Sequence, residues 1–191
     1  MSDRILIWVA LSVILAMVAG TTLQLRKPQF APPLNLEMVV KANPPRPVAT
    51  AASVDVDGVS KPFNSRITRP TLISFWATWC IPCLRELPTI GRFKAMADAA
   101  GIDVLTVSED KEGAGPAVKL LAEKGLSHLP LVIDADGSLA KSMRVKGMPT
   151  TLIVNAKGEE VARMEGEVDW GEKSSFDGVI SLLELAATPA R

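Results

Sequence analysis

The chain has 191 residues, of which 48% are hydrophobic and 22% charged, and this composition excludes an intrinsically disordered protein. Its length is that of one domain with room for an appendage. The 21 basic side chains equal the 21 acidic ones, so the chain has no excess of positive charge that would favour binding to a nucleic acid. Two cysteines and one histidine cannot supply the four ligands of a structural zinc site, and no glycine-rich phosphate loop is present. We therefore expect neither a metal nor a cofactor.

The N-terminal part of the chain contains an uncharged stretch, Ile5–Leu25. As a helix, these 21 residues would be about 31 Å long, which matches the hydrocarbon core of a bilayer. A cleaved signal peptide is the alternative, but Val18-Ala19-Gly20 offers only a mediocre cleavage site. We expect an uncleaved transmembrane anchor over residues 5–25.

Residues 26–50 are rich in proline and contain six of the 14 prolines of the chain. Such a stretch favours extended, polyproline-like backbone and acts as a semi-rigid spacer. A short apolar run, Leu34–Val40, interrupts it and could pack on the domain that follows. We therefore expect a linker over residues 26–50 and a folded domain over residues 51–191.

The first elements expected in this domain form a strand–helix–strand unit preceded by a hairpin. Asp57-Gly58 is a turn signal that joins two short edge strands within Val54–Ser60. Thr71–Trp76 and Ile102–Ser108 have the apolar character of buried strands. The helix between them ends near Gly101, with a kink at Pro88. Its buried face is marked by apolar residues spaced three or four apart: Leu84, Leu87, Ile90, Phe93 and Ala97.

Further strands and helices alternate to the end of the chain. The expected elements are a helix over Ala117–Lys124, a strand over Leu129–Ile133, one or two helical turns over Ser138–Arg144, a hairpin of Thr151–Val154 and Glu160–Met164, and a last helix from Phe176 to Ala187. Trp170 is expected to help dock this last helix. The order predicts an α/β domain with a mixed central sheet, an antiparallel edge and helices on both faces.

Both cysteines lie in the sequence Cys80-Ile81-Pro82-Cys83, between a buried strand and the start of a helix. The unpaired N–H groups and the dipole of a helix N-terminus stabilise an anion, so the pKa of a thiol there should be lowered. A thiolate attacks disulfides, and Pro82 suits a first helical turn because its missing N–H is no loss there. We expect Cys80 to be the exposed nucleophile and Cys83 to resolve the mixed disulfide.

Two plainer interpretations of the cysteine pair remain. A structural disulfide over so short a loop would stabilise the fold by only about 2 kcal/mol. Half of a metal site, completed by His128 or by a second molecule, would rest on a single donor pair. The spacing, the proline, the strand before and the helix after all favour a redox-active dithiol instead.

The segment from Phe75 to Pro88, FWATWCIPCLRELP, closely resembles the active-site segment of the TlpA/ResA-like branch of the thioredoxin superfamily. The segments Gly147–Thr151, Asp134–Gly137 and Gly166–Trp170 also match this branch, whose members carry an N-terminal anchor. The resemblance covers about residues 65–187 and implies a thioredoxin fold with an inserted strand–helix element at residues 129–144.

The resemblance also implies where a substrate binds. The Met148–Pro149 bond would be cis and packed against the dithiol, and the backbone of Met148 could pair with a substrate segment as an added strand. One of Trp76 and Trp79 should pack in the core while the other shields the dithiol. The expected substrate-binding residues are Trp79, Ile81, Pro82 and Met148, with Pro149 among the catalytic residues.

A carrier is needed for the protons of the two thiols. Glu86 follows Cys83 by three residues and so lies on the same helix face. Ser74 stands where thioredoxin has a buried aspartate that assists proton transfer, and serine cannot act as that base. We expect Glu86 to take this role, with Glu109 at the end of the second buried strand as an auxiliary candidate.

The resemblance implies a membrane-anchored thiol–disulfide oxidoreductase on the periplasmic side of a bacterial inner membrane. It would reduce selected cysteine pairs, those of apocytochromes c or of proteins that assemble the copper centre of a terminal oxidase. A membrane transporter of thiol reductant would re-reduce it. Two alternatives remain open: a disulfide-forming oxidant, and a copper-binding module that uses Cys80 and Cys83 as soft ligands.

Overall fold

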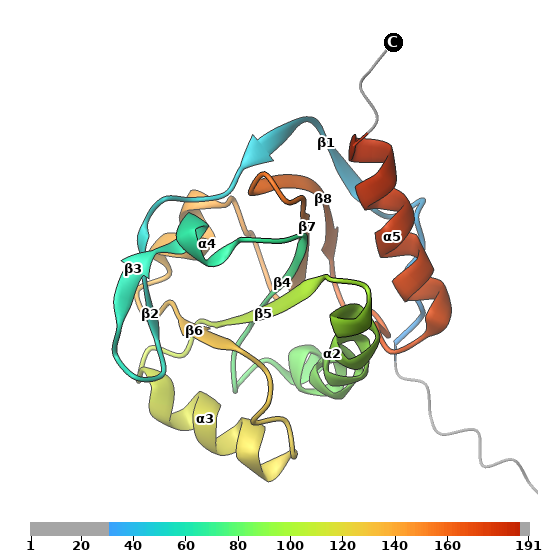
Figure 1. The fold of residues 1–191 in the computed structure, drawn as a ribbon. Coiled ribbons are helices and arrows are strands. Elements are labelled where there is room, and N and C mark those ends of the chain that lie inside the picture. Colours follow the sequence, from blue (N-terminus) through green and yellow to red (C-terminus); the bar gives the residue numbers. More distant parts are fainter. Residues whose placement is uncertain (1–30, 188–191) are drawn as a thin grey trace, which may run out of the picture.

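The computed structural model describes residues 31–187 (Figure 1). The strands are β1 (Val40–Pro47), β2 (Ala52–Asp55), β3 (Ser60–Pro62), β4 (Thr71–Trp76), β5 (Asp103–Ser108), β6 (Leu131–Ile133), β7 (Thr150–Val154) and β8 (Glu159–Glu165). The helices are the 3-10 turn η1 (Phe63–Arg66), α2 (Ile81–Ala99), α3 (Ala114–Glu123), α4 (Ser138–Ser142) and α5 (Lys173–Ala187). The expected anchor, residues 5–25, lies outside the described residues. Between residues 31 and 187, no helix has the length and apolar character needed to cross a bilayer.

All eight of these strands form one mixed sheet, in the order β1-β8-β7-β4-β5-β6-β2-β3. The central strand β4 runs parallel to β5 and antiparallel to β7. Its register with β5 runs from Thr71 opposite Asp103 to Trp76 opposite Ser108, so both strands end at the same edge. Helix α2 connects them, which confirms the expected strand–helix–strand unit and the mixed sheet.

Buried side chains cover both faces of the sheet. On one face, α2, α3 and α5 pack over Leu72, Val104 and Ile153. On the other face, η1 and α4 pack over Ile73 and Val107. Successive residues of a strand point to opposite faces, so Leu72 and Ile73 of β4 serve the two cores in turn. Helices on both faces were expected from the sequence, and the element β6–α4 occupies the place of the expected insertion.

The N-terminal part of the described chain differs from the expected spacer. Strand β1 pairs with the edge strand β8, with Val40 opposite Arg163, and its register shifts between Lys41 and Arg46, where the Asn43–Pro44 bond is cis. Proline is tolerated at the edge of a sheet because not every N–H is needed there. Residues 31–50 therefore pack on the domain, whereas the sequence predicted that the domain begins at residue 51.

The apolar run before β1 does pack on the domain, as expected. The backbone N–H of Leu34 donates to Ser175 Oγ at 2.8 Å, and its side chain is buried beside Gly178 of α5. Figure 1 shows this segment beside α5. A Cβ on Gly178 would lie 3.1 Å from Leu34 Cδ2, so the close approach depends on glycine at this position.

Candidate active site

The loop that leads from β4 to the cysteines is held by a buried carboxylate, Asp110. Its oxygens accept hydrogen bonds from the backbone N–H of Thr78 at 3.1 Å, from Thr78 Oγ1 at 2.6 Å and from Ser108 Oγ at 2.7 Å. Asp110 is fully buried, and such a carboxylate is stable in the interior only when its oxygens are hydrogen-bonded. The parallel strands β4 and β5 thus fix the position of the loop just before Cys80.

Cys80 and Cys83 form a disulfide at the start of α2. Cys80 is the N-cap residue of the helix, and its Sγ accepts a hydrogen bond from the backbone N–H of Cys83 at 3.3 Å. Pro82 occupies the first turn, where no N–H is needed. Cys80 is only 6% exposed, so it is not the exposed nucleophile expected from the sequence, and Cys83 is 1% exposed. Cys80 is the more accessible of two buried cysteines, so a substrate reaches it first.

Glu86 lies one turn further along α2, in the interior. Its Oε1 accepts hydrogen bonds from Trp170 Nε1 at 2.6 Å and from the backbone N–H of Val168 at 3.2 Å. Burial raises the pKa of Glu86 to about 8, although these two hydrogen bonds favour the charged form. Glu86 is therefore a buried carboxyl that can gain or lose a proton near neutral pH.

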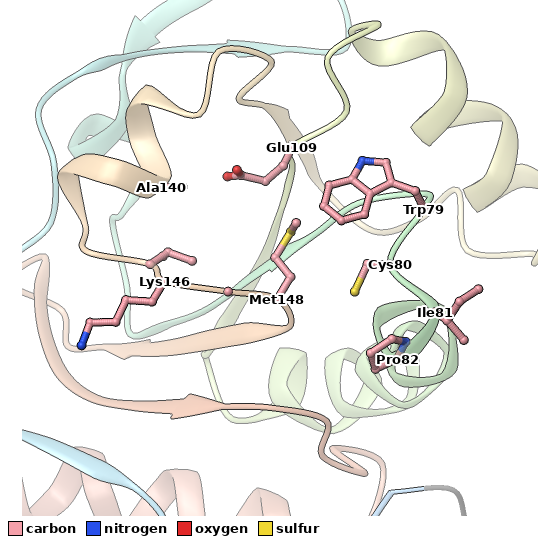
Figure 2. Close-up of a pocket in the computed structure, with 10 residues that line it drawn as sticks. Trp79, Cys80, Ile81, Pro82, Glu109, Ala140, Lys146 and Met148 are labelled. Atoms are coloured by element: carbon pink, nitrogen blue, oxygen red, sulfur yellow. The ribbon is translucent and has the colours of Figure 1, made fainter.

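The exposed side of the disulfide opens into a cavity of about 580 Å³. Figure 2 shows the residues around it. Five residues that were expected to bind the substrate or attack its disulfide line this cavity. Four come from the β4–α2 junction and the fifth from the loop before β7: Trp79, Cys80, Ile81, Pro82 and Met148. Cys83 and Glu86 lie outside this lining. The indole of Trp79 is 63% exposed whereas that of Trp76 is buried, as one of the two was expected to be.

The loop before β7 brings Met148 to the cavity, whereas the next residue, Pro149, lies outside its lining. The Met148–Pro149 bond is cis, as the resemblance implies. The carbonyl of Pro149 accepts a hydrogen bond from the backbone N–H of Gly166 at 2.9 Å. Met148 precedes Pro149, and β7 begins one residue after Pro149, at Thr150. Met148 is thus at the end of the sheet and beside the disulfide, where an extended segment could add to the strand.

Two charged residues of the cavity were not among those expected to meet a substrate. Glu109, which follows β5, and Lys146, in the loop after α4, both line the cavity. The loop after β5 carries four successive charged residues, and its position at the carboxyl end of a strand was the available signal. Trp170, expected only as a docking residue, also binds Glu86. Ser74 is buried, and its Oγ has no partner among residues 31–187.

Comparison with known proteins identifies the family of the domain. The family model described as Redoxin matches residues 41–180, which include all eight strands except the first residue of β1. This range is most of the described chain and contains the cysteine pair, the cavity and the loop before β7.

Relatives of similar sequence are named for thiol–disulfide chemistry. The thiol-disulfide oxidoreductase ResA of Bacillus thuringiensis is 25% identical over 113 residues, 59% of this chain and 64% of its own length. The thiol:disulfide interchange protein DsbE homolog of Paracoccus denitrificans is 35% identical over 95 residues, 50% of each chain. The matches thus span about half to two thirds of the relatives' own length.

Solved structures share the fold. A DsbE-type protein from Chlorobium tepidum superposes with a TM-score of 0.62 at 23% identity, over 72% of this chain and 97% of the other. A thioredoxin-like protein from Porphyromonas gingivalis gives a TM-score of 0.57 at 29% identity, over 72% of this chain and 92% of the other. Together with the matched range of the family model, these likenesses assign the chain to the Redoxin family and to the TlpA/ResA-like thioredoxin-superfamily proteins that its sequence resembles.

Proposed function

We propose that this protein is a thiol–disulfide oxidoreductase whose reacting group is the Cys80–Cys83 pair. The observation that carries the proposal is the disulfide at the N-terminus of α2, in which Cys80 lines a cavity and Cys83 does not. A structural disulfide would not need a cavity of this size beside it. The relatives that share the sequence are named for the same chemistry.

The geometry supports a two-step exchange. In the reduced protein, the Cys80 thiolate attacks one sulfur of a substrate disulfide, a mixed disulfide forms, and the second substrate sulfur leaves as a thiolate that takes a proton from solvent. Cys83 then attacks Cys80 Sγ, the protein disulfide forms, and the first substrate sulfur leaves. The substrate gains two electrons and the protein loses two.

Different groups of the protein assist the two cysteines. The backbone N–H of Cys83 that reaches Cys80 Sγ stabilises a thiolate on Cys80. Cys83 must lose its proton before it attacks, and Glu86, one helical turn away and with a pKa of about 8, can accept that proton. Ser74 offers no such group, so Glu86 is the proton carrier of this mechanism.

We further propose the physiological setting that the resemblance implies. The protein is anchored by residues 5–25 in the inner membrane of a bacterium, with its domain in the periplasm. It reduces cysteine pairs of apocytochromes c or of copper-assembly proteins of a terminal oxidase, and a membrane thiol transporter re-reduces it. In an oxidising compartment a reductant must be selective, and the cavity beside Cys80, with the Met148 edge, supports selective docking of an extended segment.

The reduction potential and a trapping experiment test this proposal together. Equilibrated with glutathione, the protein should give a potential nearer to the about −270 mV of thioredoxin than to the about −120 mV of DsbA. A value near −120 mV would support the disulfide-forming alternative instead. A Cys83→Ala variant should accumulate mixed disulfides at Cys80, identifiable by mass spectrometry, and Cys80→Ala should accumulate none. Tight binding of Cu(I) without any disulfide reductase activity would support the copper-binding alternative.

A further inference from the structure

Thr89 follows Glu86 by three residues and lies on the same face of α2. Its side chain is buried, and its hydroxyl makes two hydrogen bonds to the loop that follows β8. Thr89 Oγ1 donates to the carbonyl of Val168 at 3.3 Å and accepts a hydrogen bond from the backbone N–H of Trp170 at 3.0 Å. Val168 and Trp170 are also the two residues whose N–H groups bind Glu86 Oε1. One hydroxyl therefore holds both residues that donate to the buried carboxyl.

The residue between these two donors, Asp169, is bound by other parts of the protein. Its backbone N–H donates to the carbonyl of Pro32 at 2.8 Å, and its carbonyl accepts a hydrogen bond from Ser175 Oγ at 2.7 Å. Its carboxylate accepts a hydrogen bond from Arg92 Nη2 at 2.9 Å. The loop is thus anchored by contacts that do not involve Thr89. Loss of the Thr89 hydroxyl would free the two donors to shift without detaching the loop from the domain.

The placement of the two donors matters because Glu86 titrates near neutral pH. Burial raises its pKa to about 8, and the two hydrogen bonds counteract this rise because they favour the charged carboxylate. The negative charge of Glu167 also raises the pKa, and Arg85 Nε donates to Glu167 Oε1 at 3.0 Å. Cys83, three residues before Glu86, is the other titratable group on this face of the helix. Donors that moved away from Oε1 would keep Glu86 protonated to a higher pH.

We propose that Thr89 is a positioning residue for the transfer of the Cys83 proton to Glu86, and that it acts through the two donors that its hydroxyl holds. The inference rests on the proposed function, in which Glu86 accepts this proton. Thr89 does not line the cavity beside Cys80, so its effect on the reaction passes through Glu86. Without the hydroxyl, fewer molecules carry an ionised Glu86 at neutral pH that can accept the proton as Cys83 attacks the mixed disulfide.

NMR of isotope-labelled glutamate carboxyls measures the effect on Glu86 directly, in the oxidised full chain in mild detergent. Glu86→Gln identifies the resonance, because the signal of Glu86 is missing from its spectrum. Thr89→Val keeps the shape of the side chain without the hydroxyl, and the pKa of Glu86 should then lie about 0.5–1 pH unit above the wild-type value. Thr89→Ser keeps the hydroxyl and should retain the wild-type value. An unchanged pKa in Thr89→Val would overturn the proposal.

Thr106→Val is the matched control for the loss of a buried hydroxyl. Thr106 is a buried residue of β5 whose Oγ1 donates to the carbonyl of Pro130 at 2.8 Å, a contact that involves neither Glu86 nor its donors. This variant should leave the pKa of Glu86 at its wild-type value. A shift as large as that of Thr89→Val would reveal a general loosening of the core and would overturn the proposal. If Thr89→Val did not fold, Thr89→Ala removes the same hydroxyl and carries the same expectation.

The exchange reaction gives a second readout, which a merely structural role of Thr89 would not change. Reduced protein mixed with a nitrophenyl disulfide releases one coloured thiolate when Cys80 attacks the reagent and another when Cys83 resolves the mixed disulfide. In Thr89→Val, the pH at which the second phase reaches half of its maximal rate should rise by about 0.5–1 unit, as the pKa of Glu86 does.

The first phase is the internal reference, because Glu86 does not assist Cys80. Its rate in Thr89→Val should stay within about twofold of the wild type at every pH. A second phase with the wild-type pH dependence would overturn the positioning role of Thr89. A wild type that releases no second thiolate would instead count against the proposed oxidoreductase function itself.

Discussion

Replacing Glu86 by Gln should change how the stability of the protein depends on pH. Glu86 is 1% exposed, and burial raises its pKa from 4.5 to about 8 in the folded protein. The folded protein therefore holds this proton between about pH 4.5 and 8, whereas the unfolded chain releases it. The contribution to stability is fully present below pH 4.5 and is lost as the pH rises towards 8.

The magnitude follows from the two pKa values. Each pH unit between them costs at most about 1.4 kcal/mol, and integration from pH 5 to pH 8 gives a loss of about 3 kcal/mol in the free energy of unfolding. The amide of Gln cannot ionise, but its oxygen can still accept the hydrogen bond of Trp170 Nε1. The variant should therefore gain about 3 kcal/mol relative to the wild type over this interval.

Urea unfolding of the oxidised full chain in mild detergent, at pH 5, 6, 7 and 8, measures this difference. Glu112→Gln, which removes an exposed carboxyl, should run parallel to the wild type over the whole interval. If the Glu86→Gln curve also ran parallel to the wild type, the buried carboxyl would not hold its proton at neutral pH. Its role as the proton acceptor for Cys83 would then lose its physical basis.

Three further substitutions test contacts of the site and of the domain. Trp170→Phe removes the indole donor from Glu86 and should lower stability by about 1–3 kcal/mol at pH 8, with a smaller loss at pH 5 where the carboxyl is protonated, as measured by urea unfolding. Asp110→Asn removes one of the acceptors for Thr78 and should lower both stability, by about 1–3 kcal/mol, and the rate at which Cys80 reacts with a peptide disulfide. Leu34→Ala should cost about 2–3 kcal/mol in thermal or urea unfolding, because its side chain is buried against α5, and an unchanged stability would show that this segment is not part of the folded domain.

The elements around the cysteines could be predicted because their signals are local. The apolar strand Thr71–Trp76, the helix with apolar residues three or four apart and the turn at Asp57-Gly58 each depend on neighbours in the sequence. Gly58 has a φ of 77°, a backbone conformation that glycine adopts at little cost. The same local reading placed Cys80 and Cys83 at the start of a helix.

Strand β1 could not be predicted from its own residues. Three prolines within Val40–Pro47 argue for a spacer, since proline cannot donate to a strand ladder. The strand can form because it lies at the edge of the sheet and pairs with β8. Its register with β8 shifts between Lys41 and Arg46, the segment that contains the cis bond before Pro44. Its partner is more than one hundred residues away, so no local pattern contains this information.

The electrostatics of the site also depend on distant residues. Glu86 could be singled out by its spacing from Cys83, but its donor Trp170 is separated from it by 84 positions. Glu109 could be recognised as a charge at the end of a strand, but only the fold brings Asp134 against it. The residues that carry the chemistry were readable from the sequence, whereas the groups that set their protonation were not.

The most direct test of the redox account is the alkylation rate of Cys80. In the reduced full chain at pH 7, iodoacetamide should modify Cys80 faster than free cysteine, because the helix N-terminus and the N–H of Cys83 stabilise its thiolate. Cys83, which is almost fully buried, should remain largely unmodified in the same peptide map. A Cys80 that reacts no faster than free cysteine would contradict the assignment of this sulfur as the nucleophile.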